Sequence, residues 1–117
     1  MSIYKEFAQA LLPDGILDYC DLTDFKKKGN ALLIFLEEKP VIPSEYKDES
    51  YRLNGFMPEV TIKDFPIREF KAELKIKRRR WLLTGSNTKV TGNWDLLSPG
   101  TRMTKGFADF LKELAKY

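Results

Sequence analysis

The strongest constraint on the fold of this chain is the strict alternation of apolar and charged residues at positions 69–83, EFKAELKIKRRRWLL. Successive side chains of an extended chain leave on opposite faces, so the alternation predicts a strand with one buried face. The apolar face holds Phe70, Ala72, Leu74 and Ile76. The charged face holds Lys71, Glu73, Lys75 and Lys77. Core and solvent are therefore expected on opposite sides of a sheet at this segment.

The first half of the chain contains a hairpin pattern. Residues 16–26 (ILDYCDLTDFK) and 31–38 (ALLIFLEE) are extended, apolar-containing segments on either side of Lys28-Gly29-Asn30, which is a turn signal. Residues 39–58 combine proline, glycine and many charges, so we expect an irregular connection with one helical turn near Ser44.

The second half contains further extended segments. EVTIKDF at 59–65 alternates and predicts a strand. Gly85-Ser86-Asn87 predicts a turn, after which residues 88–97 return as a partner strand that bears Trp94.

Helical periodicity is confined to the two ends of the chain. Ile3, Phe7 and Leu11 recur at i, i+4 and i+8, which predicts an amphipathic helix over residues 3–12 with these side chains on its apolar face. Thr101 or Thr104 is suited to cap a final helix. The apolar positions of that helix are Phe107, Phe110, Leu111 and Leu114. We expect it to cover the apolar face formed by Phe70, Leu74 and Ile76.

These elements predict the α+β class, with a small, mostly antiparallel sheet of about five strands in two hairpin-like segments, an N-terminal helix and a C-terminal helix. A chain of 117 residues is one ordinary domain. Its expected parts are 1–38 (helix plus hairpin), 39–58 (irregular connection), 59–97 (basic hairpin region) and 101–117 (C-terminal helix). The longest apolar run has only six residues, 31–36, so we expect no membrane span and no secretory signal, and a reducing cytoplasmic location.

The residue types present exclude several kinds of chemistry. The chain has no histidine and one cysteine, Cys20, so it offers neither a disulfide nor a zinc site of nitrogen and sulfur ligands, nor a triad or dyad that needs histidine. We interpret Cys20 as a small, half-buried apolar residue. The acidic residues Asp14, Asp18, Asp21 and Asp24 are interpreted as a solvated surface rather than a metal site. We therefore expect no catalytic activity, no metal and no cofactor.

Charge is divided unevenly along the chain. Residues 1–65 contain 8 Lys and Arg against 12 Asp and Glu, a net charge of −4, whereas residues 66–117 contain 12 against 5, a net charge of +7. Such a division suits oriented docking on a polyanion such as nucleic acid. The alternative is that folding brings acidic and basic segments together and cancels the field.

The densest group of cations is the run from Lys75 to Trp81, KIKRRRW. Strict alternation would direct Arg78 and Arg80 toward the core, which cannot hold free guanidinium groups. Either the strand passes the edge of the core before Arg78, or a bulge or acidic partners such as Glu73 and Asp95 accommodate the arginines. In the first case all the cations reach solvent at one rim. The candidate nucleic-acid contacts in this run are Lys75, Lys77, Arg78, Arg79, Arg80 and Trp81. For Trp81 there are two interpretations, packing in the core and stacking on a base.

Several ordered motifs carry a family resemblance over nearly the whole chain. They are MSIYKEFAQALLPDGILDY, EEK with IPSEYK, EVTIKDFPIR, IKRRRW and GTRMTKGFADFLKE. In this order they resemble the N-terminal region proteins of a group of bacterial insertion-sequence transposases. In that group the transposase is split, and a longer downstream frame holds the acidic catalytic core.

The resemblance implies that this chain is the upstream, DNA-recognising part. Single-chain relatives place a cysteine zinc ribbon before a helix-turn-helix, but the ribbon cysteines are missing here, so zinc is not implied. The terminal segment resembles the opening helix of the helix-turn-helix, with Arg102 and Lys105 at a DNA-facing helix start.

Residues and resemblance together predict a non-catalytic DNA-binding accessory module that recognises or positions transposon-end DNA. The alternative is a protein-interaction domain that docks on the separately encoded catalytic transposase subunit, because arginine-rich rims serve both purposes. The expected partners are duplex DNA and the catalytic subunit, without a membrane or a small-molecule substrate.

Overall fold

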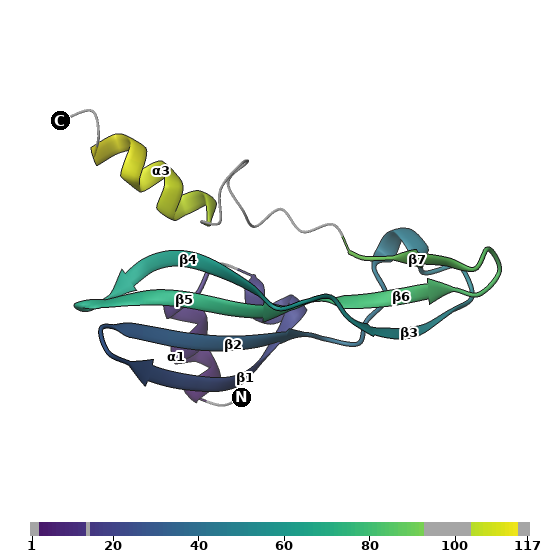
Figure 1. Cartoon of the computed structure of the whole chain (residues 1–117), viewed down its shortest axis with the longest axis horizontal. Helices are drawn as coiled ribbons and strands as arrows, with labels where there is room; N and C mark the ends of the chain where they lie inside the picture. The colour runs from purple at the N-terminus through teal and green to yellow at the C-terminus, as the bar shows by residue number, and fades with distance from the viewer. Residues whose placement is uncertain (1–2, 14, 93–103, 115–117) are drawn as a thin grey trace.

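Two antiparallel hairpins lie side by side and form the larger of two sheets (Figure 1). The structure is a computed structural model, and it describes residues 3–13, 15–92 and 104–114. The strands of this main sheet are β1 (Cys20–Lys28), β2 (Ala31–Glu38), β4 (Val60–Ile67) and β5 (Phe70–Lys77), in the order β1-β2-β5-β4. The hairpins β1-β2 and β4-β5 are antiparallel, but β2 and β5, which join them, run parallel from Ala31↔Lys71 to Glu37↔Lys77.

A small antiparallel sheet continues the main sheet along the long axis of the molecule, which measures 53 × 35 × 25 Å (Figure 1). Its strands are β3 (Tyr51–Phe56), β6 (Arg79–Leu83) and β7 (Thr88–Val90), in the order β3-β6-β7. Only Arg78 separates β5 from β6. One extended stretch of chain therefore passes from the first sheet into the second.

The core lies between one face of the main sheet and the first two helices, α1 (Ile3–Leu11) and α2 (Ile16–Tyr19). We call this face of the sheet the inner face. The helical region contributes Leu12, Ile16 and Leu17, with Ala8 packed at the margin. The sheet contributes Cys20, Ile34, Leu36, Ile62, Leu74 and Ile76. Burying these side chains is the main favourable contribution to the stability of the domain.

The two remaining helices lie at the margins. The 3-10 helix η1 (Ser44–Tyr46) occurs in the long connection, as the turn expected near Ser44. Helix α3 (Lys105–Leu114) lies beside β4, where Thr104 N donates to Lys63 O (3.0 Å) and Thr104 Oγ1 donates to Asp64 Oδ1 (2.9 Å). Thr104 Oγ1 also accepts from Phe107 N at 3.4 Å, which confirms Thr104 as a helix cap.

The α+β class and the main features of the strand pattern are confirmed. Ala72, Leu74 and Ile76 are buried, while Lys71 and Lys77 are exposed, as the alternation predicts. The hairpin around residues 28–30 and the turn at residues 85–87 are also present. The described residues form seven strands in two sheets rather than about five in one.

Two strand predictions were wrong. Residues 39–58 are not irregular throughout, because β3 forms there by pairing with β6 (Tyr51↔Leu83, Leu53↔Trp81). Residues 70–83 are not one strand, because the ladder of the main sheet ends at Lys77 and pairing resumes at Arg79 in the small sheet. The predicted strand at 88–97 is described only as β7, and Trp94 lies outside the described residues.

The packing of both terminal helices differs from expectation. Ile3, Phe7 and Leu11 are exposed, because Leu12 and α2 occupy the inner face in their place. Leu74 and Ile76 pack in that same cluster rather than under the C-terminal helix, whose described ring contact is Phe107 with Phe65 of β4, at 5.4 Å between centroids. The side chains of Phe110 and Leu114 lie outside what the structure describes.

Candidate nucleic-acid interface

The arginine run of the sequence lies at the junction between the two sheets. Arg79 holds the end of β2 there: its backbone N donates to Glu38 Oε1 at 2.7 Å, and its Nε donates to Glu38 O at 2.8 Å. Its guanidinium also lies 4.5 Å from the ring centroid of Phe56 on β3. Glu38 is buried, so this paired arrangement satisfies a carboxylate that would otherwise be costly to place there.

The two neighbouring arginines also bond to main-chain carbonyls. An Nη2 hydrogen of Arg78 is donated to Gly92 O, and Arg80 Nε donates to Asn54 O at 3.1 Å. The carbonyl of Arg78 accepts from Met57 N at 2.7 Å. All three arginines are half-buried. The strand is interrupted at Arg78, between the ladders of the two sheets, and main-chain carbonyls accept from the guanidinium groups of Arg78 and Arg80. Asp95, one of the acidic partners expected for these arginines, lies outside the described residues.

The other predicted contacts are scattered. Trp81 is 0% exposed, so its interpretation as a base-stacking residue was wrong and its packing interpretation is confirmed. Lys75 donates from Nζ to Thr61 Oγ1 at 2.8 Å and lies 3.6 Å from Glu73 Oε1, while Lys77 is exposed. Lys105 is half-buried in the first turn of α3.

Arg102 lies outside the described residues. The structure therefore does not gather the predicted set into one solvent-facing row.

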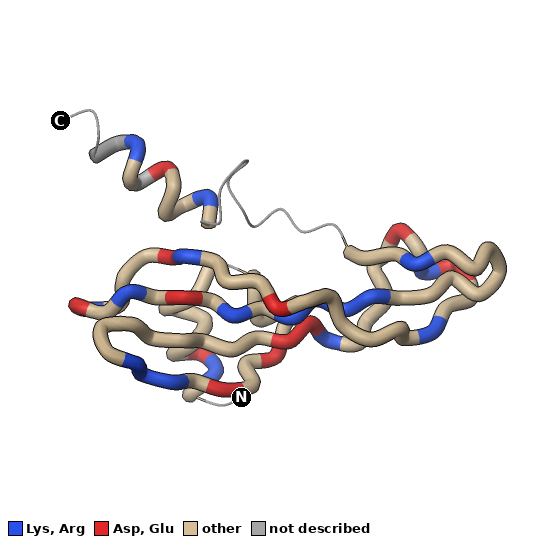
Figure 2. Tube along the Cα trace, viewed as in Figure 1, with Lys and Arg blue, Asp and Glu red and all other residues tan. Residues whose placement is uncertain are grey.

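A different basic surface is formed where the two hairpins of the main sheet turn. Lys28 pairs with Ala31, and Ala31 pairs with Lys71 of the parallel neighbour, so lysines from distant parts of the sequence flank one residue. The turn between β4 and β5 adds Arg68. We call this surface the basic hairpin end; its residues are Lys26, Lys27, Lys28, Arg68 and Lys71, all of them exposed. Figure 2 shows Lys and Arg positions at both hairpin turns.

Two lysines of the basic hairpin end contact aromatic rings. Lys27 Nζ lies 4.3 Å from the ring centroid of Phe70, and Lys26 Nζ lies 5.5 Å from that of Phe35, so both ammonium groups make cation–π contacts at the surface. Glu69 is the one carboxylate in the two turns. Arg68 has a left-handed φ of 59°, a conformation that favours glycine.

Sequence reasoning missed this surface although part of its signal was visible. The KKK run directly precedes the Gly29-Asn30 turn, so a basic hairpin end could have been noted there. Its completion by Arg68 and Lys71 depends on the parallel β2–β5 pairing, which has no local signature.

The described aspartates near Cys20 in the sequence lie at the surface, whereas Cys20 itself is buried. Asp18, Asp21 and Asp24 are exposed, and no group of three or more potential metal-ligating side chains occurs within residues 3–13, 15–92 and 104–114. Cys20 is buried, and burial, reinforced by the nearby negative charges of Glu38 and Asp21, raises the pKa of its thiol to about 12. At neutral pH the thiol is protonated and therefore a poor nucleophile.

Comparison with protein-family models, with curated proteins and with solved structures gives no significant match. None of the helices in the described parts of the chain has the length and apolar character needed to cross a membrane.

Replacing Glu38 with Ala should lower the free energy of unfolding by about 1–3 kcal/mol, because the part-buried backbone N–H of Arg79 loses its acceptor. Urea unfolding followed by circular dichroism measures the change. Glu45→Ala, at an exposed position of η1, is the control and should stay within about 0.5 kcal/mol of the wild type. Equal stabilities of the two variants would contradict the role of Glu38 at the junction.

The raised pKa of Cys20 predicts a loss of stability at alkaline pH. Between the ordinary thiol pKa of 9.0 and the folded value of about 12, the unfolded chain binds fewer protons than the folded one, so stability falls as pH rises. The contribution of the protonated Cys20 thiol to the free energy of unfolding is complete below pH 9 and decreases above that pH by about 1.4 kcal/mol per pH unit. Urea midpoints at pH 8 and pH 10.5 should therefore fall more steeply for the wild type than for Cys20→Ala. Parallel decreases would show that the thiol does not contribute.

Proposed function

We propose that this protein is a DNA-binding accessory module without catalytic chemistry, and that it contacts duplex DNA through the basic hairpin end. The observation that supports the proposal is the gathering of five exposed cations from two hairpins at one end of the main sheet. Such a cluster attracts the phosphate backbone and releases its counterions. With the resemblance to transposase N-terminal regions, the proposed target is transposon-end DNA in the cytoplasm, positioned for a separately encoded catalytic subunit.

The shape of the basic hairpin end suits a duplex. Neighbouring strands lie about 4.8 Å apart, so the ends of β1, β2 and β5 span about 10 Å. A two-stranded ribbon such as β1-β2 fits the major groove, which is about 12 Å wide. Lysines supply mobile point charges to phosphates, and the fork of Arg68 matches either two phosphate oxygens or the edge of guanine.

The orientation of charge along the main sheet also supports the proposal. Asp21 lies near the end of β1 that is distant from the turn and Asp24 lies at its middle, and Glu37 lies beside Asp21 across the β1–β2 ladder. At that end the acidic residues lie beside cations, since Glu37 pairs with the exposed Lys77 of β5, whereas the turn end of the main sheet is mainly basic (Figure 2). An anionic duplex is attracted most strongly to the turn end, where few carboxylates offset the cations.

A second candidate function uses the same charges with a different partner. The basic hairpin end also suits an acidic protein surface, so docking on the catalytic subunit remains the alternative. Binding to isolated duplex at low salt distinguishes the two functions, because the DNA-binding function requires such binding and docking on the catalytic subunit does not.

Replacing Lys26, Lys27 and Lys28 together with Ala should weaken duplex binding and reduce its salt dependence. With five phosphate contacts the slope of log affinity against log salt is about −4.5. The variant loses three of these contacts, so its slope should be shallower by about 2.7. Fluorescence anisotropy with a duplex that carries the element's ends, and with a scrambled duplex, measures both slopes.

The matched control removes the same number of charges from exposed positions away from the basic hairpin end: Lys47, Lys89 and Lys112, each changed to Ala. Its slope should stay close to that of the wild type. An equal loss in both triple variants would contradict a defined basic surface. Absence of binding at low salt together with co-purification of the catalytic subunit would favour the alternative function.

Arg68 offers a test that separates binding from stability. Arg68→Gly removes the cost of a left-handed φ in a residue with a side chain, about 1–2 kcal/mol. The added freedom of glycine in the unfolded chain lowers the free energy of unfolding by about 0.5–1 kcal/mol. The variant should therefore be at least as stable as the wild type. The same change removes one cation and should lower duplex affinity several-fold. Thermal unfolding and anisotropy measure the two effects. Unchanged affinity would contradict the binding role of Arg68, and a less stable variant would contradict the expected relief of its left-handed conformation.

A further inference from the structure

The first hairpin of the main sheet ends in a two-residue turn. Lys28 and Ala31 form the closing pair of the β1–β2 ladder, so the turn consists of Gly29 and Asn30, and both residues are exposed. The turn lies at one end of the long axis of the molecule, beside the turn between β4 and β5 (Figure 1). Since glycine carries no side chain, the side chain of this turn that can recognise a ligand is the amide of Asn30.

Asn30 is held in place by two neighbouring strands. Its main-chain carbonyl accepts from Lys71 N at 2.8 Å, and the next residue, Ala31, pairs with both Lys28 and Lys71. Asn30 thus lies between two exposed lysines, on backbone that the sheet fixes. A side chain on such a rigid element is placed precisely enough to recognise one particular ligand group.

The conformation of the turn does not require asparagine at position 30. Gly29 has a left-handed φ of 60° and Asn30 has no positive φ, which is the pattern of a type II′ turn with glycine first. Asparagine is favoured in turns because it tolerates a left-handed φ, as Asn87 does with φ 54°, or because its side chain bonds to nearby backbone. Within residues 3–13, 15–92 and 104–114, the side-chain amide of Asn30 makes no hydrogen bond. Neither reason applies to Asn30, and its amide is available to a ligand.

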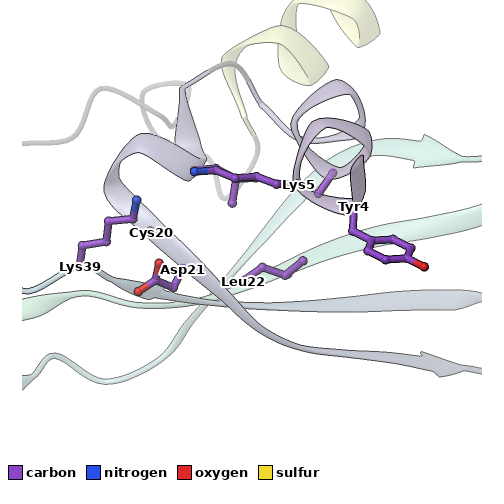
Figure 3. A pocket seen from close by; sticks show the side chains of 8 residues that line it. Tyr4, Lys5, Cys20, Asp21, Leu22 and Lys39 are labelled. Carbon is purple, nitrogen blue, oxygen red and sulfur yellow. The ribbon is translucent and has the colours of Figure 1, made fainter. Parts of the chain in front are cut away.

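A pocket between α1 and β1 also offers cations, but its shape and charge differ from those of the turn. It has a volume of about 270 Å³, and its lining includes Lys5, Lys39 and Asp21 (Figure 3). Base edges lie at the floor of a groove in the duplex, so a protruding element reaches them and a hollow does not. The carboxylate of Asp21 also offsets part of the positive charge at the pocket. Base recognition therefore belongs to the protruding turn.

We propose that Asn30 reads an adenine in the major groove of the duplex bound at the basic hairpin end, an inference that rests on the proposed function. The amide of asparagine matches the major-groove edge of adenine: Nδ2 donates to N7, and Oδ1 accepts from the N6 amino group. Lys28 and Lys71, on either side of Asn30, contact phosphates, which position the turn but carry no sequence information. Affinity thus comes from the cations, and sequence preference comes from the neutral Asn30.

Selection from a pool of duplexes with a randomised central segment tests the inference. The wild type should enrich duplexes that share an A·T pair at one position. Asn30→Ala should lose this preference and bind the selected duplex about 5- to 150-fold more weakly, which is the effect of one contact with two hydrogen bonds. Its slope of log affinity against log salt should equal that of the wild type, because the substitution removes no charge.

The matched control is Asn87→Gly, in the turn between β6 and β7. Glycine adopts the φ of 54° found there, so the fold should be retained. The position lies outside the basic hairpin end, and the base preference of this variant should equal that of the wild type.

A modified base tests the same contact without a change in the protein. Replacing the selected adenine with 7-deazaadenine removes the N7 acceptor, so the affinity of the wild type should fall several-fold and that of Asn30→Ala should not change. The assignment of Asn30 would be overturned, and the proposed function left in place, by a wild type that binds duplex but enriches no sequence, by unchanged affinity of the wild type for the modified duplex, or by equal losses in both proteins. Absence of duplex binding at low salt would instead overturn the proposed function, and this inference with it.

Discussion

The parallel pairing of β2 with β5 is the interaction on which the rest of the structure depends. It joins two hairpins that are each too small to be stable alone, and it aligns Ile34, Leu36, Leu74 and Ile76 into one buried face. It also sets the two edges of the main sheet. The β4 edge is covered where Thr104 N donates to Lys63 O, whereas β1 keeps an open edge, interrupted by a bulge between Leu22 and Asp24.

The junction after β5 shows why arginine runs are ambiguous in sequence. A guanidinium group donates equally well to phosphate oxygens and to main-chain carbonyls. Here Arg78, Arg79 and Arg80 donate to the carbonyls of Gly92, Glu38 and Asn54, which connects the segment after β7, the end of β2 and β3 where the chain leaves one sheet for the other. The lysines of the first hairpin turn contact aromatic rings instead, Lys26 with Phe35 and Lys27 with Phe70, and they lie at the opposite end of the main sheet from these arginines.

Local pattern predicted those parts of the fold that depend on local physics. Period-two alternation located the buried face of β5, and Gly29 with Asn30 located the first turn. Local pattern could not predict the features that depend on pairing between segments distant in the sequence. β3 forms because it pairs with β6, and Lys71 lies near Lys28 because both residues pair with Ala31. The amphipathic pattern of α1 was read correctly as a helix, but a stripe such as Ile3 and Phe7 does not say whether it packs on the core or lies at the surface. For the candidate site, the lysine run 26–28 was visible in the sequence, but its grouping with Arg68 and Lys71 was visible only in the structure.

The central claim, that duplex DNA contacts the basic hairpin end, is tested most directly by titrating ¹⁵N-labelled protein with duplex and following the backbone amide signals. The account predicts that the largest shifts occur at residues 26–30 and 68–71, with little change at residues 78–80. Shifts centred on residues 78–80 or on α3, with the hairpin turns unaffected, would contradict it.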